Sequence, residues 1–189
     1  MGRHRRWLRS VGAAFADELS RAGFDLVLIA RKPGPLQETA DKARSNGVQV
    51  RTLALDLLDD DAVEEIRKAT EDIEVGLFIF NAGANSYGHE FVTGDLDGFR
   101  GVIELNVHRQ IELSHLFGGP MKERGRGGIM LLGSLSGYMG AEHQSIYAAR
   151  RRSAASSPKV CGSSSHRTAC TWSNWYSVSP APRRWCARA

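Results

Sequence analysis

Four apolar runs divide this chain of 189 residues at regular intervals. Two of them, Phe24–Ala30 (FDLVLIA) and Val75–Phe80 (VGLFIF), contain almost no polar residue, and the others are Val48–Leu55 and Gly128–Leu132. Apolar runs of this length without polar alternation indicate strands that are buried on both faces. Such strands are typical of parallel sheets, so the runs predict a parallel sheet of the α/β class.

Segments with apolar residues at helical spacing separate these runs. We expect helices over residues 12–22, 36–46, 59–70 and 96–116. The alternation of strands and helices predicts a doubly wound sheet with right-handed crossovers. A ligand of such a sheet binds beyond the carboxyl ends of the strands. Polar residues that directly follow a strand are therefore the candidates for a binding site.

The two ends of the chain differ in composition from its middle. Residues 11–142 hold 13 basic and 21 acidic residues, whereas the segments on either side hold basic residues and no acid. The four tryptophans and the three cysteines also lie in these end segments. We therefore expect one domain over residues 12–149, an aberrant segment over 1–11, and an aberrant, disordered segment over 150–189.

Composition also excludes several classes of partner. The formal net charge of +4 comes from the ends of the chain, so it does not indicate a nucleic-acid partner. No stretch approaches the ~20 consecutive apolar residues of a membrane helix, and no signal-peptide run follows the first arginines. The cysteine spacing fits no zinc site. We expect a cytoplasmic protein that binds neither a metal, nor nucleic acid, nor a membrane.

The first candidate site follows two of the predicted strands. Asp56 closes the run LALD, and Asn81, Ala82 and Gly83 come directly after VGLFIF. A carboxylate at the end of a strand can accept a hydrogen bond from an adenine amino group, and small residues let the backbone approach a nucleotide closely. Taken singly, Asp56 is better explained as a helix N-cap and the other three residues as a plain turn.

The second candidate site pairs Ser134, just past GIMLL, with Tyr147 thirteen residues later. A phenol acts as a general acid or base at a carbonyl when a nearby cation lowers its pKa, and a serine hydroxyl can hold the substrate oxygen. A cation four residues after Tyr147 would lie one helical turn further on, and Arg151 occupies that position. Spacing alone does not separate this site from a turn serine and a half-buried tyrosine.

Asn106 is a third candidate, since asparagine is disfavoured inside a long apolar helix. Two interpretations are open. The residue is either an ordinary exposed position or a buried polar group that organises a water or a lysine.

Together these elements resemble the short-chain dehydrogenase/reductase family over roughly residues 12–149. VGAAFADELSRAGFDLVLIAR is similar to the family's first helix and second strand, LALDLLD to its adenine-contacting aspartate segment, and FNAGA to its Asn-Ala-Gly motif. ELNV is similar to the segment with the family's catalytic asparagine, and GSLSGYMG through SIYAA to the segment with its serine and tyrosine. The resemblance implies a Rossmann-like fold.

The resemblance also assigns roles. Asn106, Ser134 and Tyr147 would be three of four catalytic residues, with Tyr147 as the general acid/base and Ser134 as the substrate-orienting hydroxyl. Six residues would contact the cofactor, namely Gly12, Arg31, Asp56, Asn81, Ala82 and Gly83. Arg31 stands where an acidic residue would bond a ribose 2′-hydroxyl, and it can pair with a 2′-phosphate, so NADP (NADPH) is expected rather than NAD. The alternative for Arg31 is a solvated basic turn.

Two positions depart from the family pattern, and the sheet is therefore expected to be incomplete at both ends. Residues 1–11 supply neither the family's first strand nor its TGxxxGIG turn, which would cradle a pyrophosphate. Arg151 occupies the place of the catalytic lysine, and a guanidinium does not reproduce the contacts of an ammonium. A shifted reading frame would explain the C-terminal composition, because another frame of residues 158–178 can encode a helix, a strand and a turn.

Two functions remain open. In the first, the chain is an NADP-dependent oxidoreductase that interconverts a small-molecule carbonyl and an alcohol by hydride transfer, as a homo-oligomer if its frame is intact. In the second, it is a non-catalytic nucleotide-binding remnant or an interaction module with basic tails. The sequence does not indicate the substrate, because the family's substrate loop would lie in the altered C-terminal segment.

Overall fold

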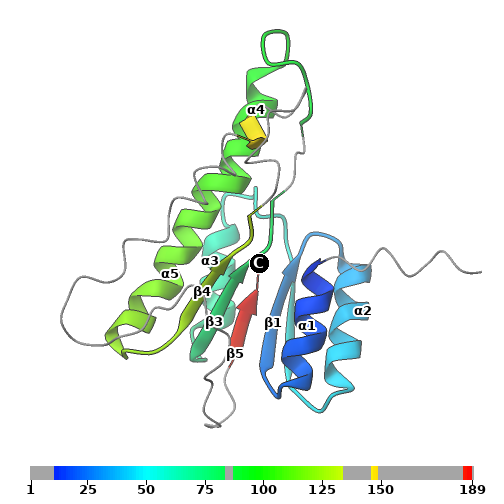
Figure 1. The fold of residues 1–189 in the computed structure, drawn as a ribbon, viewed down its shortest axis with the longest axis vertical. Helices are drawn as coiled ribbons and strands as arrows, with labels where there is room; N and C mark the ends of the chain where they lie inside the picture. The colour runs from blue at the N-terminus through cyan, green and yellow to red at the C-terminus, as the bar shows by residue number, and fades with distance from the viewer. Residues whose placement is uncertain (1–10, 84–86, 134–145, 149–184, 189) are drawn as a thin grey trace, which may run out of the picture.

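The computed structural model describes residues 11–83, 87–133, 146–148 and 185–188. Its centre is a five-stranded sheet with the order β2-β1-β5-β3-β4 (Figure 1). The strands are β1 (Asp25–Ala30), β2 (Val50–Ala54), β3 (Val75–Phe80), β4 (Gly128–Leu131) and β5 (Trp185–Arg188). Neighbouring strands are parallel throughout, which confirms the predicted α/β class and the parallel sheet.

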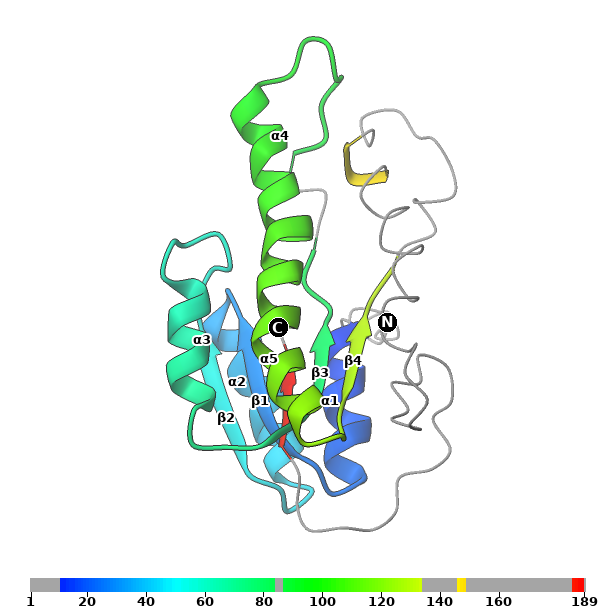
Figure 2. The same cartoon turned by 90° about the vertical axis from the view of Figure 1, so that its left-hand side faces the viewer.

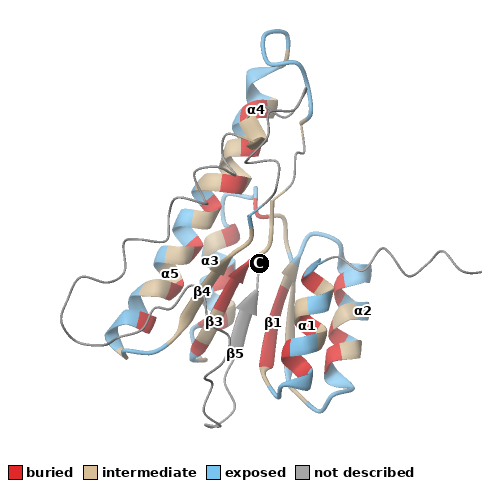
Figure 3. Ribbon diagram, in the orientation of Figure 1, coloured by how far each residue is buried: buried red, intermediate tan, exposed pale blue. Residues whose placement is uncertain are grey.

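Helices cover both faces of this sheet (Figures 1 and 2). They are α1 (Val11–Arg21), α2 (Pro33–Arg44), α3 (Ala62–Thr70), α4 (Leu96–Ile103), the π-helical turn η1 (Glu104–His108) and α5 (Arg109–Glu123). The first two helices cover one face, and α3 and α5 cover the other. α4, η1 and α5 form one rod, whose α4 end rises beyond the carboxyl ends of the strands (Figure 1). Much of this tip is exposed (Figure 3).

Two-sided burial explains the apolar runs of the central strands. In β1, Leu26 and Leu28 pack on the face that α1 covers, together with Leu19 of that helix. Val27 points to the other face and packs with Leu113 of α5. Successive strand residues point to opposite faces, so a strand covered on both sides has no solvent-facing position for a polar side chain.

The helical rod is longer and less regular than the sequence predicts. The prediction is a single helix over residues 96–116, whereas the rod runs over residues 96–123 and contains η1. At that turn the backbone N–H of Arg109 donates to the carbonyl of Glu104, five residues earlier. This spacing defines a π-turn, which is frequent at functional sites.

The central strand β5 comes from the segment that we expected to be disordered. Within residues 150–189 the structure describes Trp185–Arg188, and this strand pairs with β1 on one side and β3 on the other (Figure 1). These four residues are thus ordered, contrary to the expectation. The physical reason is that two open strand edges offer backbone donors and acceptors to any extended segment of matching length. Apart from Val11, which begins α1, the rest of both end segments lies outside the described residues.

Candidate functional site

Arg31 and Asp56 meet at the carboxyl edge of the sheet. Arg31 directly follows β1, Asp56 lies two residues after β2, and the two strands are neighbours. Nη1 of Arg31 lies 3.3 Å from Oδ2 of Asp56, and the Arg31 side chain is 68% exposed. The other oxygen of the Asp56 carboxylate accepts the backbone N–H of Leu58 at 3.1 Å. Asp56 is therefore not a helix N-cap, since α3 begins only at Ala62.

The segment Asn81–Gly83 directly follows β3 at the same edge of the sheet. All three residues are half-buried, and Ala82 packs against the apolar core beneath α5. Gly83 has a φ of +131°, a conformation that other residues rarely adopt. The carbonyl of Phe80, just before this segment, accepts the N–H of Leu132 at 3.0 Å. The backbone of residues 81–83 is therefore fixed by its neighbours, and the small side chains of Ala82 and Gly83 leave it accessible at close range.

Gly12 lies in the first turn of α1 and is buried. α1 leads into β1 through a short turn and runs antiparallel to it, so the N-terminus of α1 lies at the carboxyl edge of the sheet (Figure 1). The first turn of α1 contains no acidic residue. Helix N-termini at this edge of an α/β sheet are the usual place for a phosphate.

Asn106 lies in η1 and is fully buried. Its Nδ2 donates to the carbonyl of Val102 at 2.8 Å. Of the two interpretations that the sequence leaves open, the exposed one is wrong. The residue is a buried polar group in an irregular turn of the helix, where it can hold the local backbone in a defined shape.

The structure describes one of the residues of the second candidate site. Tyr147 is half-buried in a short helical turn over residues 146–148. In Figures 1 and 2 this turn lies at the height of α4, beyond the carboxyl end of β4. Ser134 and Arg151 lie outside the described residues. Their proximity to Tyr147 stays a prediction.

Arg109 is a buried cation that the sequence reasoning did not single out. Its side chain is 9% exposed, and its Nε donates to the carbonyl of Leu57 at 2.7 Å. A sequence feature could have revealed it. Arg109 begins a stripe of residues four apart, continued by Leu113, Phe117 and Met121, that faces the core. A charged residue on such a stripe needs buried partners.

Other features of the described residues lie away from this edge. A hollow of about 260 Å³ lies between α3 and α5, by Val75, Phe117 and Arg124, at the amino end of β3. Among the described residues no three of His, Cys, Asp or Glu are placed to hold a metal ion. None of the helices described is long and apolar enough to cross a membrane.

The order and direction of the strands, and the polar residues at their carboxyl ends, are those of a nucleotide-binding α/β sheet. The sequence pattern of the short chain dehydrogenase family matches residues 8–156. The chain belongs to the short-chain dehydrogenase family. In the usual strand order of this fold, the first strand of the chain is a central strand, between the second and the fourth. In this short-chain dehydrogenase the corresponding central place, between β1 and β3, is occupied by β5.

Curated relatives of this short-chain dehydrogenase are oxidoreductases. It is 31% identical over 142 residues to 7beta-hydroxysteroid dehydrogenase of Clostridium sardiniense, covering 75% of this chain and 54% of that protein. It is 30% identical over 145 residues to very-long-chain 3-oxoacyl-CoA reductase of Mus musculus, covering 75% of this chain and 46% of that protein. The chain thus spans about half the length of the curated relatives it matches.

Solved structures share the fold. The bulky-bulky ketone specific alcohol dehydrogenase from Comamonas testosteroni superposes with a TM-score of 0.70 at 25% identity, over 76% of this chain and 58% of that one. A short-chain dehydrogenase from Sphingobium yanoikuyae in complex with NADPH also has a TM-score of 0.70, at 30% identity, over 76% of this chain and 57% of that one. The Rossmann-like fold implied by the sequence is confirmed.

Proposed function

We propose that this short-chain dehydrogenase binds NADP and carries the site of an oxidoreductase that interconverts a small-molecule carbonyl and an alcohol, with Arg151 in place of the family's lysine. The observation that carries the proposal is the position of Arg31 beside Asp56 at the ends of neighbouring strands. A guanidinium there can pair with a 2′-phosphate, which NADP has and NAD lacks. Two solved relatives favour the same cofactor, since one is a complex with NADPH and another a complex with NADP.

The residues at the carboxyl edge fit the parts of a dinucleotide. Arg31 would hold the 2′-phosphate, and the carboxylate of Asp56 would accept from the adenine amino group. The half-buried backbone of Asn81–Gly83 would lie against the nucleoside. The N-terminus of α1, where Gly12 places no side chain, would face the pyrophosphate. When bound, NADPH supplies the hydride for the reduction of a carbonyl.

The residues of the second candidate site would carry out the proton transfer. Tyr147 would protonate the substrate oxygen as the carbonyl is reduced, and Ser134 would hold that oxygen by a hydrogen bond. Arg151 would provide the nearby cation. Asn106, buried in η1, would keep the backbone of the helix in the shape that the site needs.

A titration with NADP⁺ and NAD⁺ tests the proposal. We expect NADP⁺ to bind at least about tenfold more tightly, because a charge-assisted hydrogen bond contributes about 1.5–3 kcal/mol. The Arg31→Ser variant should lose this preference and keep its affinity for NAD⁺. Arg100→Ser is the matched control, since Arg100 is also exposed and ion-paired, at 2.7 Å from Asp97. Equal affinities of the unaltered chain for both dinucleotides would contradict the NADP assignment.

A second function, a nucleotide-binding protein without catalysis, is favoured by one observation. Position 151 carries arginine where the family's motif has its lysine. The two functions differ in a simple assay, in which the oxidation of NADPH is followed with a panel of ketones and aldehydes. NADP⁺ binding without turnover of any carbonyl, both by this chain and by a version with the other reading frame restored at both ends, supports the second function. Turnover by either protein supports the first.

A further inference from the structure

Every nitrogen of the buried Arg109 guanidinium has a partner. Nε donates to the carbonyl of Leu57 at 2.7 Å and lies 3.4 Å from the carboxylate of Glu104. Nη2 donates to the carbonyl of Asp59 at 3.1 Å, and Nη1 to the carboxylate of Glu112 at 2.9 Å. Arg109 belongs to α5, whereas two of its acceptors belong to the segment between β2 and α3. The side chain therefore ties two distant parts of the chain together.

The segment that Arg109 holds is the one that carries Asp56. The carboxylate of Asp56 accepts the N–H of Leu58 at 3.1 Å, and its carbonyl accepts the N–H of Asp59 at 3.1 Å. These bonds form one tight turn over residues 56–59. The two carbonyls bound by Arg109, of Leu57 and Asp59, lie within the same turn. Movement of the guanidinium would displace the turn, and with it the Asp56 carboxylate.

At its other end Arg109 adjoins the turn that carries Asn106. The backbone N–H of Arg109 closes η1 by donating to the carbonyl of Glu104. Because η1 is wider than an α-helical turn, residues after it are rotated relative to those of a straight helix. The π-turn thus affects the direction in which the Arg109 side chain leaves the rod. One residue is bonded to the Asn106 turn by its backbone and to the Asp56 turn by its side chain.

We infer that Arg109 is a positioning residue that fixes the position of the Asp56 turn relative to the Asn106 turn. It would act on the adenine side of the cofactor site through Asp56, without touching the cofactor itself. This inference rests on the proposed function. It goes further, because it assigns the geometry of the adenine contact to a residue of the helix that bears the family's catalytic asparagine.

Arg124 provides a control at the far end of the same helical rod. Its Nη2 donates to the carbonyl of Val75, and its Nε lies 3.7 Å from the carboxylate of Glu74. Its side chain is 20% exposed. Arg124 therefore also ties a helix to a strand end through a carbonyl, but at the amino edge of the sheet. A lysine at either position keeps the charge and loses the planar fork that spans several acceptors.

The experiment compares Arg109→Lys with Arg124→Lys at a temperature where both are folded. Affinities are measured for NADP⁺ and for 2′,5′-ADP, which contains only the adenine side of the cofactor. We expect Arg109→Lys to weaken both ligands about tenfold and Arg124→Lys to leave both within about twofold. Hydrogen exchange of the amides of Leu58 and Asp59 should speed up in Arg109→Lys alone.

Two results would overturn the inference. The first is an unchanged affinity for 2′,5′-ADP in folded Arg109→Lys, and the second is unchanged exchange of the two amides. A failure of the proposed function looks different, because the unaltered chain would then bind neither ligand. In that case faster hydrogen exchange of the two amides in Arg109→Lys would still show that Arg109 restrains the Asp56 turn. Unchanged exchange would refute this restraint.

Discussion

The guanidinium of Arg31 lies 3.3 Å from the carboxylate of Asp56, across the ends of two neighbouring strands. The Arg31 side chain is 68% exposed, so solvent screens the pair and its contribution to stability is small. The pair matters more for binding. A 2′-phosphate that approaches Arg31 has to compete with Asp56 for the guanidinium, and it meets the negative charge of the carboxylate.

We expect Asp56→Asn to raise the preference for NADP⁺ over NAD⁺. The amide oxygen can still accept from the N–H of Leu58 and from an adenine amino group, while the competing charge is gone. A gain of about threefold to tenfold corresponds to about 1 kcal/mol, the upper range for an exposed ion pair. Both affinities are measured by titration. Asp97→Asn is the control, since Asp97 pairs with Arg100 at 2.7 Å on α4 and should not affect the ratio. A lower NADP⁺ preference in Asp56→Asn would show that Asp56 and the 2′-phosphate do not compete for Arg31.

Two glycines of α4 should respond to alanine in opposite directions. A Cβ at Gly98 would lie 2.6 Å from the ring of Tyr87, whose hydroxyl accepts the N–H of Asp95 at 2.7 Å. Gly98→Ala should therefore cost about 1–3 kcal/mol. A Cβ at Gly101 would meet nothing within 4 Å, so Gly101→Ala should stabilise by about 0.5–1 kcal/mol. Urea unfolding measures both, and equal effects would argue against the packing of Tyr87 on α4.

Phe78 should be far more sensitive to truncation than an exposed phenylalanine. It is fully buried, and its ring centroid lies 4.9 Å from that of Phe117 and 6.3 Å from that of Phe80. Phe78→Ala should cost about 3–5 kcal/mol, a large share of the ~5–15 kcal/mol that stabilises a domain. Phe91→Ala is the matched control. Phe91 is 55% exposed, and its loss should cost about 1 kcal/mol or less. Similar urea midpoints for the two variants would contradict this ranking.

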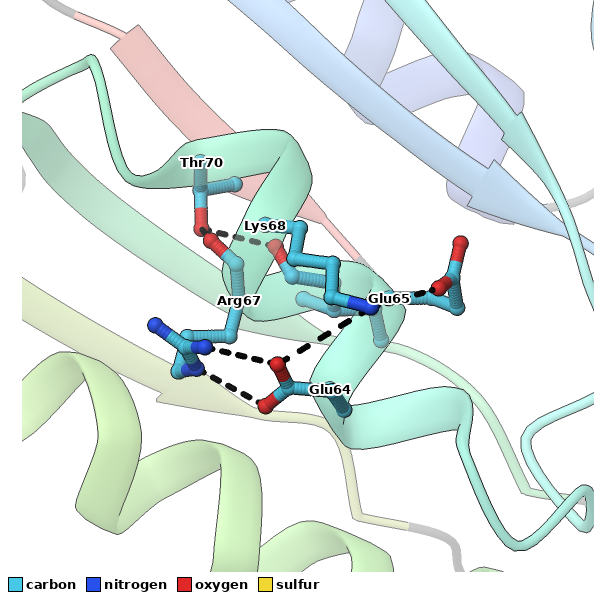
Figure 4. Close-up of polar contacts among 6 residues, drawn as sticks. Glu64, Glu65, Arg67, Lys68 and Thr70 are labelled. Atoms are coloured by element: carbon cyan, nitrogen blue, oxygen red, sulfur yellow. Dashed lines mark hydrogen bonds and ion pairs between the residues drawn. The ribbon is translucent and has the colours of Figure 1, made fainter.

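The ion pairs of α3 predict an acid-side pH dependence (Figure 4). The carboxylate of Glu64 accepts from Nε and Nη2 of Arg67 at 2.8 and 2.6 Å. These hydrogen bonds from Arg67 hold the pKa of Glu64 below its ordinary value. The pair therefore adds stability above the ordinary pKa of the unfolded chain, and the contribution disappears as the pH falls through the lower pKa of the folded state.

Arg67→Gln should move the pKa of Glu64 back up toward its ordinary value. A carbon-detected NMR titration of the carboxyl groups measures this shift. Asp72 serves as the internal control, because hydrogen bonds from Arg51 lower the pKa of Asp72 independently of Arg67. A Glu64 pKa that is unchanged in Arg67→Gln would show that the bidentate pair does not persist in solution.

We expect little or no oxidation of NADPH by the chain with its present residues. Arg151 stands at the place of the family's lysine, and a planar guanidinium does not present the compact donor group of an ammonium to a tyrosine and a ribose. Arg151→Lys alone should remain nearly inactive, whereas a version with the other reading frame restored at both ends should turn over. The assay follows NADPH absorbance with a panel of carbonyl compounds. Robust turnover by the unaltered chain would refute this prediction.

Elements with a strong burial pattern are predictable from the sequence, and elements held by specific contacts are not. β3 matches its predicted range, because a fully apolar run ends at Asn81. α3 begins three residues later than the predicted start at Asp59, since Asp59 is part of the Asp56 turn. β5 is too short to show any period. At the candidate site, the sequence identifies Arg31 and Asp56 separately, but their contact follows from strand order, which a local pattern does not contain.

The central place of β5 has a consequence for synthesis of the protein on the ribosome. β3 is complete at residue 80, yet the strand that joins it to β1 ends at residue 188. At ~5–20 residues per second, translation of the intervening chain takes on the order of 5–20 s. During this time β1 and β3 each have an open edge, which is a template for pairing with other chains. The edges of β1 and β3 that β5 covers in the folded sheet therefore stay unpaired until β5 has been synthesised.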